Sequence, residues 1–339
     1  MTPITAGDDP IEHCYQQGWT DGLPVVPPTR ERVSAMLAGR SADEVVAVLE
    51  PSGAEATLEL IAANAVMAGC LPAYFPVVVA AVRAAAERAF GLEGVLTTVH
   101  SQSPLLLVNG PIVERLGFNT GPNALGSGTR PNATIGRAFN LVMRNVAGAR
   151  EGGLDPKTIA HPGKYSYCLA EGESGWTSQQ VERGFSATTS TVTLFAADAP
   201  LCLAVLNAEK PEQILGTIAD AMTVAGTYNL AFGGEILLVF SPEHAAICAG
   251  LSKDEVRAWL FERGRRPVHS LAGLGVIEEA TLLGRAERVA DPDQLIGPVR
   301  NAEGIRIVVS GGDVGGYTAL IFCSGRSVIM PIEEEPDGV

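Results

Sequence analysis

A glycine-rich segment that leads into a helix is the strongest chemical feature of the sequence. Residues 117–137 read GFNTGPNALGSGTRPNATIGR, and Asn132 is the expected helix cap. Glycines let a backbone approach a ligand closely, and free amides at a helix start attract anions. The segment predicts a carboxylate, phosphate or oxyanion site with these substrate-binding side chains: Asn119, Asn123, Arg130, Asn132, Thr134 and Arg137. The alternative is a buried loop at a contact between subunits.

Two histidines are candidate catalytic residues because each lies beside a predicted strand. His100 follows the β-branched run at 95–99, and His244 lies in the first turn of a helix after the apolar run 236–239. Ligands of α/β proteins usually bind at the ends of strands. A helix start disfavours the charged form of His244, which leaves a neutral imidazole that can act as a base. His161 is a rival candidate, and an ordinary surface position is the alternative for each ring.

The segment KYSYC at 164–168 gathers an amine, two phenols and a thiol. Lys164 and Tyr165 are the candidate catalytic donors in it. In an extended strand, Lys164 and Cys168 would share a face, and the amine would lower the pKa of the thiol. The alternative is an ordinary strand with a buried cysteine. Further along the chain, Arg183 is a candidate substrate-binding residue beside Glu182.

The remaining chemistry-bearing residues are scattered. The sequence has six cysteines without a C-x-x-C pair, and its five histidines form no H-x-H or H-E-x-x-H pattern. This spacing predicts neither a zinc cluster nor a disulfide framework, so we expect reduced thiols and no metal site. No particular cofactor is indicated.

The elements that must position these residues indicate an α/β protein. The apolar runs 105–108 and 236–239 are related by a shift of 131 residues, and each leads into a helix that starts near a proline, Pro111 or Pro242. Ala-rich helices are expected before both, at 76–90 and 211–225. We therefore expect two pseudo-repeated α/β halves with mixed sheets, preceded by a Pro-rich N-terminal arm.

This interpretation divides the chain into five parts. They are an arm and short helix (1–50), a first half (51–150), a turn-rich insert (151–190), a second half (191–290), and C-terminal strands with an acidic tail (291–339). The arm contains WTDGLPVVPPT at 19–29, and Thr29 should cap a helix that ends before Gly39. The arm either packs across a domain surface or forms a wall of a pocket. An insert of this length with little periodicity is more often functional than accidental.

Composition limits the partners. The 339 residues carry 24 Lys and Arg against 38 Asp and Glu, a formal net charge of −14. Such a chain repels phosphate backbones and anionic lipid, so we expect neither nucleic acid nor a membrane surface as a partner. With no secretory signal evident at the start, the sequence predicts a cytoplasmic protein, and its Pro- and Gly-rich arm suggests a homo-oligomer.

Several of these stretches resemble bacterial proteins related to, or encoded beside, the so-called UGSC proteins. The resemblance spans most of the chain, and it rests on WTDGLPVVPPT (19–29), VNGP (108–111), RPNATIGR (130–137), PGKY (162–165), VERGF (181–185) and SPEHA (241–245). That resemblance implies thiol or selenol chemistry and a small thiol-protein partner. This chain departs from the pattern because it has no Cys-Gly-Ser-Cys motif and no cysteine in HSQSP at 100–104.

Taken together, these features predict an enzyme that performs lyase, hydratase or hydrolase chemistry on a small anionic or amide-bearing molecule. In this hypothesis the glycine-rich loop stabilises negative charge, and His100 or His244 moves the proton. One alternative is a non-catalytic or partner-dependent subunit of a thiol or selenol redox system. Another is a redox enzyme that uses Cys168 or Cys70 directly.

Overall fold

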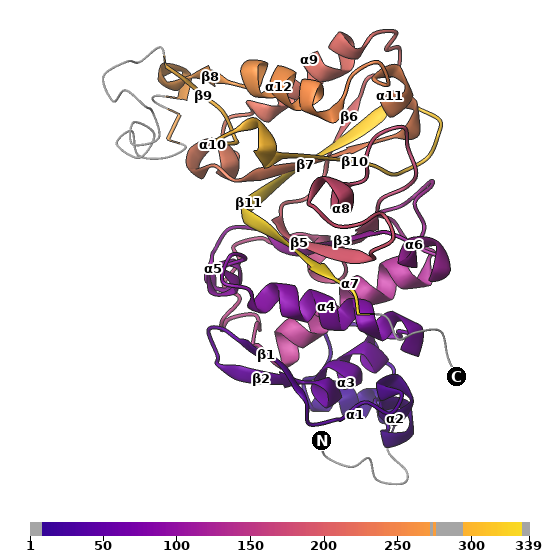
Figure 1. The fold of residues 1–339 in the computed structure, drawn as a ribbon. Helices are drawn as coiled ribbons and strands as arrows, with labels where there is room; N and C mark the ends of the chain where they lie inside the picture. The colour runs from indigo at the N-terminus through magenta and orange to yellow at the C-terminus, as the bar shows by residue number, and fades with distance from the viewer. Residues whose placement is uncertain (1–8, 272–273, 276–293, 334–339) are drawn as a thin grey trace.

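The computed structural model describes residues 9–271, 274–275 and 294–333, so the acidic tail beyond residue 333 lies outside the described part (Figure 1). The chain mixes helices and strands throughout, which confirms the α/β class. The helices are α1 (Pro10–Gln16), α2 (Arg30–Leu37), α3 (Leu58–Ala68), α4 (Phe75–Ala86), α5 (Leu92–Thr97), α6 (Ile112–Arg115), α7 (Arg130–Asn145), α8 (Gln179–Glu182), α9 (Pro211–Met222), α10 (Tyr228–Phe232), α11 (Pro242–Ile247) and α12 (Lys253–Arg263).

The strands are β1 (Val45–Leu49), β2 (Ala54–Thr57), β3 (Ser103–Asn109), β4 (Cys168–Ala170), β5 (Thr191–Ala197), β6 (Leu201–Ala204), β7 (Glu235–Phe240), β8 (Arg266–Pro267), β9 (Leu295–Ile296), β10 (Ile305–Val309) and β11 (Tyr317–Pro331). Among the described residues, seven of them form one mixed sheet in the order β10-β7-β11-β5-β3-β4, with β6 paired to β11. Strands of both expected halves therefore belong to a single sheet.

The pattern of parallel and antiparallel pairing is the same from either edge of the sheet to its middle. On one side β10 pairs in parallel with β7, and β7 pairs antiparallel with β11; on the other, β4 pairs in parallel with β3, and β3 pairs antiparallel with β5. The two sets meet where β11 and β5 pair antiparallel. With the 3-10 helices and α8, β8 and β9 left out, the elements also follow in the same order, α4-α5-β3-α6-α7-β4-β5 and α9-α10-β7-α11-α12-β10-β11. This order agrees with the expected repeat, while duplication itself stays a prediction.

The sheet is curled, and apolar residues cover both of its faces. Gly172, just after β4, donates its amide to the carbonyl of Val309 at the end of β10 (2.8 Å), so the two edge strands approach each other. Leu105 and Leu107 face the inner side, where they form a cluster with buried residues of β4, β5, β7, β10 and β11. Leu106 points to the outer side, as alternation along a strand requires.

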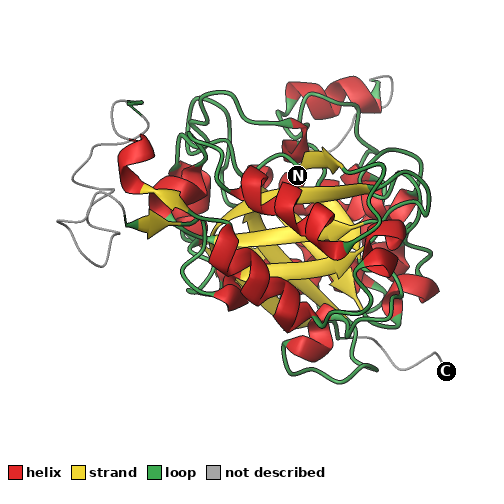
Figure 2. Ribbon diagram, turned by 90° about the horizontal axis from the view of Figure 1, so that it is seen from above, coloured by secondary structure: helices red, strands yellow, loops and turns green. Residues whose placement is uncertain are grey.

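Two groups of helices cover the outer side. Helices α3, α4 and α7 lie below the sheet in Figure 1, and α9, α11 and α12 lie above it; Figure 2 shows the helices arranged around the strands. Each group has its own apolar core: the first packs on β3, β4, β5 and the end of β11, and the second packs on β6, β7, β10 and the start of β11. No helix within the described ranges has the length and apolar character needed to cross a membrane.

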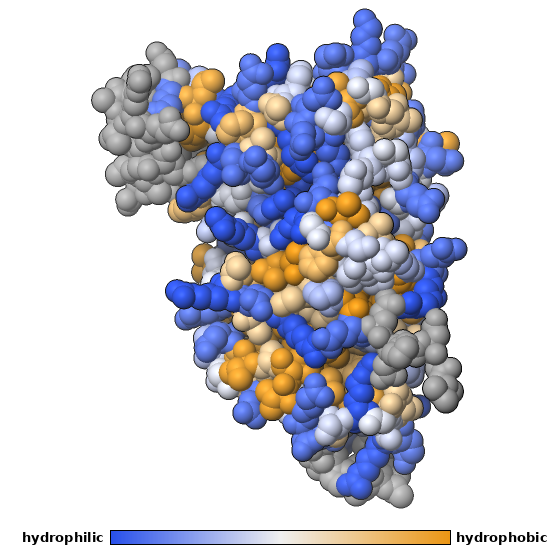
Figure 3. Space-filling model, viewed as in Figure 1, coloured by the Kyte–Doolittle hydropathy of each residue, from blue (hydrophilic) through white to orange (hydrophobic). Residues whose placement is uncertain are grey.

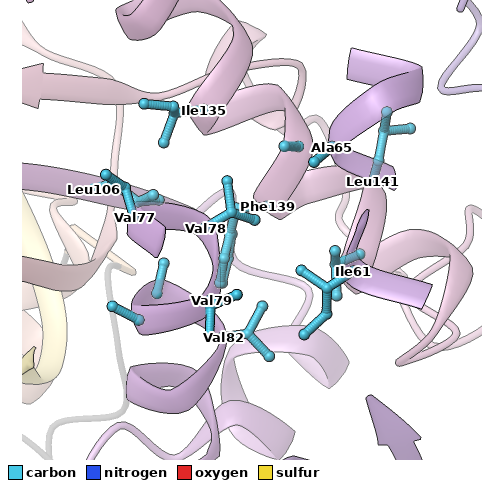
Figure 4. Packing of buried hydrophobic residues seen from close by; sticks show 14 of the residues in the cluster. Ile61, Ala65, Val77, Val78, Val79, Val82, Leu106, Ile135, Phe139 and Leu141 are labelled. Carbon is cyan, nitrogen blue, oxygen red and sulfur yellow. The ribbon is translucent and has the colours of Figure 1, made fainter. Parts of the chain in front are cut away.

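The core formed with α3, α4 and α7, called the first core below, shows why α7 forms where the sequence predicts a helix. The sequence shows apolar residues at helical spacing here, Ile135, Phe139, Val142, Met143 and Val146. The first four are buried, Val146 is half-buried at the C-cap, and Phe139 packs among Val78 and neighbouring residues of α4 (Figure 4). The expected cap is wrong, because α7 begins at Arg130 after Thr129 and Asn132 lies inside its first turn. Pro131 near the helix start has no amide to leave unpaired, which allows the earlier start.

Three other predicted helices are present, whereas one predicted strand is not. Thr29 caps α2 as expected, and the predicted helices at 76–90 and 211–225 are α4 and α9. The run at 95–99 was expected to be a strand and is not one, since α5 ends at Thr97 and His100 lies in the loop before β3. In a run this short, burial of Val95 and Leu96 against the first core outweighs the β-preference of the branched residues.

One exposed apolar region accompanies these cores. Figure 3 shows hydrophobic residues gathered over β1 on the face in view, where Val45 and Val48 are exposed. The two-stranded sheet of β1 and β2 leaves these side chains uncovered. The expected homo-oligomer stays a prediction.

We predict that Phe139→Ala lowers the free energy of unfolding by about 3–5 kcal/mol, because a fully buried ring is replaced by a cavity. Urea denaturation of the purified protein measures the change. Val314→Ala is the control; its side chain is 80% exposed, so its effect should stay within about 0.5 kcal/mol. A loss below about 1 kcal/mol for Phe139→Ala would show that this core is not packed as described.

Candidate functional site

The predicted anion loop satisfies many of its polar groups internally. The Asn132 side chain accepts the amide of Asn119 (2.9 Å) and donates to the carbonyls of Asn119 (3.0 Å) and Ala124 (3.2 Å). Asn123 donates to the Ser127 carbonyl (2.6 Å). These bonds fix the shape of the loop, so its amide side chains act on the protein's own backbone.

The neighbouring side chains are engaged in the same way. Arg130 is exposed and donates to the Gly69 carbonyl (3.0 Å), while the Thr134 hydroxyl donates to the Arg130 carbonyl (2.8 Å). The Asn119 side chain donates to the Pro122 carbonyl (2.8 Å). A substrate-binding role for this loop stays a prediction, and it does not enter the proposal below.

Arg137 joins the N-terminal arm to α7. Its guanidinium makes two bonds to the carboxylate of Asp21 (2.9 and 2.8 Å) and one to the Pro24 carbonyl (3.0 Å). This bidentate geometry is the strong form of an Arg–carboxylate pair. It holds Asp21 and Gly22 in the wall of a cavity.

The cavity has a volume of about 590 Å³, within the range of small-molecule sites. Its walls come from the arm, α5, the start of β3, the second half of α7 and the turn-rich insert. The insert therefore lines a cavity, while its expected functional role stays a prediction. Lys164, Tyr165 and the rival histidine His161 are in this lining; the other polar side chains are Asp21, Asn140, Arg144, Glu151 and Asp155.

Asp155 organises the cations at one end of the cavity. Its carboxylate pairs with Lys164 (2.8 Å) and with Lys157 (2.9 Å). Burial alone would raise the pKa of Asp155, but the bonds and charges of the two lysines outweigh burial and leave that pKa below its usual value. Lys157 is buried and also donates to carbonyls at the end of α5, so Lys164 is the more exposed of the two amines.

Arg144 and Glu151 form a second ion pair in the lining. Two bonds join them, one from each terminal nitrogen of the guanidinium. The bond from Arg144 is the main cause that lowers the pKa of Glu151 to about 2. The cavity thus carries both signs of charge, with carboxylates and cations side by side.

The KYSYC segment at 164–168 is not one extended strand, as the sequence analysis expected. Lys164 ends a short 3-10 helix (Pro162–Lys164), and the strand begins only at Cys168. Lys164 pairs with Asp155 and therefore does not activate Cys168; burial instead raises the pKa of that thiol. The prediction that Lys164 and Cys168 share one face of a strand is wrong, because the segment preceding β4 is turned rather than extended. Tyr165 is 47% exposed.

His161 is held as a neutral ring. Its Nδ1 accepts the Gly163 amide and its Nε2 donates to the Ala197 carbonyl, both at 3.1 Å. Burial lowers the pKa of His161. With both nitrogens bonded to backbone groups, this ring shapes the cavity wall and is a poor proton carrier.

His100 is paired with Asp198, a residue that the sequence analysis did not identify. Its Nε2 contacts the Asp198 carboxylate at 2.6 Å, and its ring stacks on Tyr228 with centroids 4.4 Å apart. Asp198 directly follows the buried strand β5, so its position at a strand end was the available signal. The partner itself could not be identified because 98 residues separate the two in the sequence.

The loop that carries His100 packs against the cavity wall. Thr158 donates its amide to the Val99 carbonyl (3.1 Å), and Ala160 donates to the Ser101 hydroxyl (3.2 Å). Both neighbours of His100 are therefore bonded to the insert. Lys164 and Tyr165 line the cavity, whereas His100 is outside its lining, in the loop that is bonded to its wall.

His244 and Arg183 lie elsewhere. His244 is fully buried; its Nε2 donates to the Val205 carbonyl (3.3 Å) and its Nδ1 accepts the Thr318 hydroxyl (2.8 Å). Burial lowers the pKa of His244, so the neutral ring is favoured as predicted, but by burial and not by the helix start. A ring without exposed surface cannot contact a substrate. Arg183 lines a different cavity, described below.

The thiols of the described residues are mostly buried and protonated. Burial raises the pKa of Cys70 to about 12 and that of Cys248 to about 11, whereas Cys202 is exposed. Within the described ranges, no three His, Cys, Asp or Glu side chains gather as they would around a metal ion. No family model matches the chain, and no curated protein matches it. The UGSC resemblance therefore stays a prediction.

We predict that iodoacetamide at about pH 8 labels Cys202 first in the native protein, because it is the exposed thiol and buried thiols stay protonated. Peptide mass spectrometry identifies the labelled site. Cys202→Ser should remove this rapid labelling, and urea should expose the other thiols as a control. Labelling of Cys70 or Cys168 as fast as Cys202 would contradict the burial and favour the redox hypothesis.

We also predict that His244 contributes to loss of stability in weak acid. Burial lowers the pKa of His244 in the folded chain, so the unfolded chain binds its proton at higher pH. The free energy of unfolding therefore falls as pH drops below about 6.5, and His244→Gln should flatten that fall. Urea midpoints between about pH 7.5 and about pH 5.5 measure both slopes. Parallel slopes for the two proteins would exclude this contribution.

Proposed function

We propose that the cavity beneath the turn-rich insert is the active site of an enzyme that performs lyase, hydratase or hydrolase chemistry on a small polar molecule. One observation carries this proposal. Lys164 and Tyr165, consecutive residues of the insert, place an amine and a phenol in one lining with charged side chains of the arm and α7, and the wall of that lining is bonded to the loop that carries His100.

The charges of the lining favour an amide-bearing or zwitterionic substrate over a strongly anionic one. Asp21, Glu151 and Asp155 offset the charges of Arg144 and Lys164. A polar ligand with both donors and acceptors can bond to both signs of charge, whereas a polyanion would meet three carboxylates. The Lys164 amine and the Tyr165 phenol, as the more accessible donors, would bind a carbonyl or carboxylate oxygen.

His100 is the best-placed proton carrier in this proposal. Asp198 accepts the Nε2 proton of His100, which fixes the tautomer and leaves Nδ1 with a lone pair that can take a proton. The Tyr228 ring stacked against it limits rotation of the imidazole. An oriented imidazole of this kind supports proton abstraction or activation of water. His244, buried with both nitrogens bonded, has no role here.

The alternative, a non-catalytic subunit of a thiol or selenol system, has no separate observation in its favour. The exposed thiol, Cys202, is not in the lining of the proposed active site. The cytoplasmic location and the small thiol-protein partner stay predictions.

We predict that at least one small carboxylic acid or primary amide raises the melting temperature of the protein, because it binds the folded state alone. Lys164→Gln should weaken that ligand about tenfold through loss of a charged hydrogen bond. For a ligand that is converted, followed by proton NMR, His100→Asn should slow turnover by about 10²–10⁴-fold with little change in affinity.

Lys210→Gln is the matched control, because this exposed lysine lies outside the cavity lining. It should leave the affinity and the turnover unchanged. If Lys164→Gln and His100→Asn behave like Lys210→Gln towards every ligand that binds, the active site is elsewhere.

A further inference from the structure

A second cavity, of about 710 Å³, lies in the other half of the sheet. Its walls come from the end of α8, from α10, from the start of β7, from the segment before β10 and from the bend in β11. Four arginines are in its lining: Arg183, Arg300, Arg306 and Arg326. The proposed function touches this cavity at one residue: Tyr228 is in its lining and stacks on His100.

The cavity is cationic in an acidic protein. Among the described residues, its lining holds four arginines and two glutamates, Glu235 and Glu303, which gives 4 − 2 = +2, whereas the whole chain has a net charge of −14. Glu235 is already shared between Arg306 (2.7 Å) and the Ser327 amide (3.0 Å). A hollow with this charge concentrates anions because low-dielectric walls focus the field.

The arginines keep unused donors. Arg183 is half-buried and bonds through its two terminal nitrogens to Ser327 (3.0 and 3.2 Å). Arg306 has a buried Nε without a hydrogen-bond partner. Arg300 and Arg326 are exposed at the rim. Burial, followed by the like charge of Arg306, lowers the pKa of Arg183, so the two guanidinium groups repel each other. A bound anion would relieve this repulsion and satisfy the free donors.

An aromatic stack forms one side of the cavity. Tyr228 lies between His100 (4.4 Å) and Phe232 (4.6 Å, centroid to centroid), and Phe232 is 46% exposed. Both faces of Tyr228 are therefore occupied, while Phe232 offers free apolar surface beside the arginines. A ligand with a planar group next to its anionic group fits this arrangement.

The two cavities occupy corresponding places in the sheet. The first lies by the start of β3 and the segment before β4, and the second lies by the start of β7 and the segment before β10. Since β3 and β7 correspond in the strand order, each half has a hollow at the same position. The linings differ: the first mixes both signs of charge, and the second is dominated by arginine.

We propose that the second cavity binds a phosphoryl anion through Arg183, Arg300 and Arg326. Several guanidinium groups that different segments contribute to one lining suit a tetrahedral, multiply charged anion, whereas one carboxylate is satisfied by a single bidentate arginine. The site takes a phosphate ester or a diphosphate, with any planar part of the ligand against Phe232. It is independent of the chemistry assigned to the first cavity.

Calorimetric titration with inorganic pyrophosphate tests the site. Binding should weaken as sodium chloride increases, because screening reduces the attraction. Arg300→Gln and Arg326→Gln each remove an exposed charge without disturbing a described bond, and the double variant should weaken binding about tenfold. Arg30→Gln is the control, since this exposed arginine on α2 lies outside the cavity.

Three outcomes would overturn the proposal. The first is no pyrophosphate binding below about 1 mM, the level of a weak non-specific contact. The second is binding that Arg30→Gln weakens as much as the double variant does. The third is binding lost in Lys164→Gln and kept in the double variant, which would place the anion in the first cavity. The proposal is supported if the double variant weakens pyrophosphate binding and Lys164→Gln leaves it unchanged. This result would stand even if the proposed function of the first cavity failed.

Discussion

Burial of both faces of the central strands is the constraint on which the structure depends. The strands β3, β5 and β7 have no exposed position, so their inner side chains need one another and their outer side chains need helices. The curl of the sheet meets the first need, and the bond from Gly172 to Val309 marks where its edges approach. The helices on either side meet the second need.

This constraint moves the polar chemistry to the ends of the strands. A buried strand interior cannot hold unpaired charges, so loops before β3 and after β5 carry His100 and Asp198, and the segments before β4 and β10 carry part of the polar linings of the two cavities. The regular strand order therefore places two hollows in corresponding positions. Their different charges come from loop residues such as Asp155 and Arg300 together with residues of regular elements, such as Arg144 in α7 and Arg306 in β10.

Charged pairs within the loops then fix the geometry of the first cavity. Arg137 and Asp21 hold the arm against α7, and Asp155 holds Lys164 beside the buried Lys157. Such pairs are costly to bury unless their donors and acceptors are matched, which is the case for the bidentate contact at Asp21. They explain how segments with few regular elements can form a defined wall.

The sequence by itself determined the α/β class, the apolar stripe of α7, the cap of α2 and the strands at 105–108 and 236–239, because these follow from local periodicity and capping. It also singled out Lys164, Tyr165 and His100 by residue type. Only the tertiary structure decided that Asp198 partners His100, that His244 is buried, and that Asn132 bonds its own loop. Those outcomes depend on contacts between residues far apart in the chain, and local patterns contain no information about which distant groups meet.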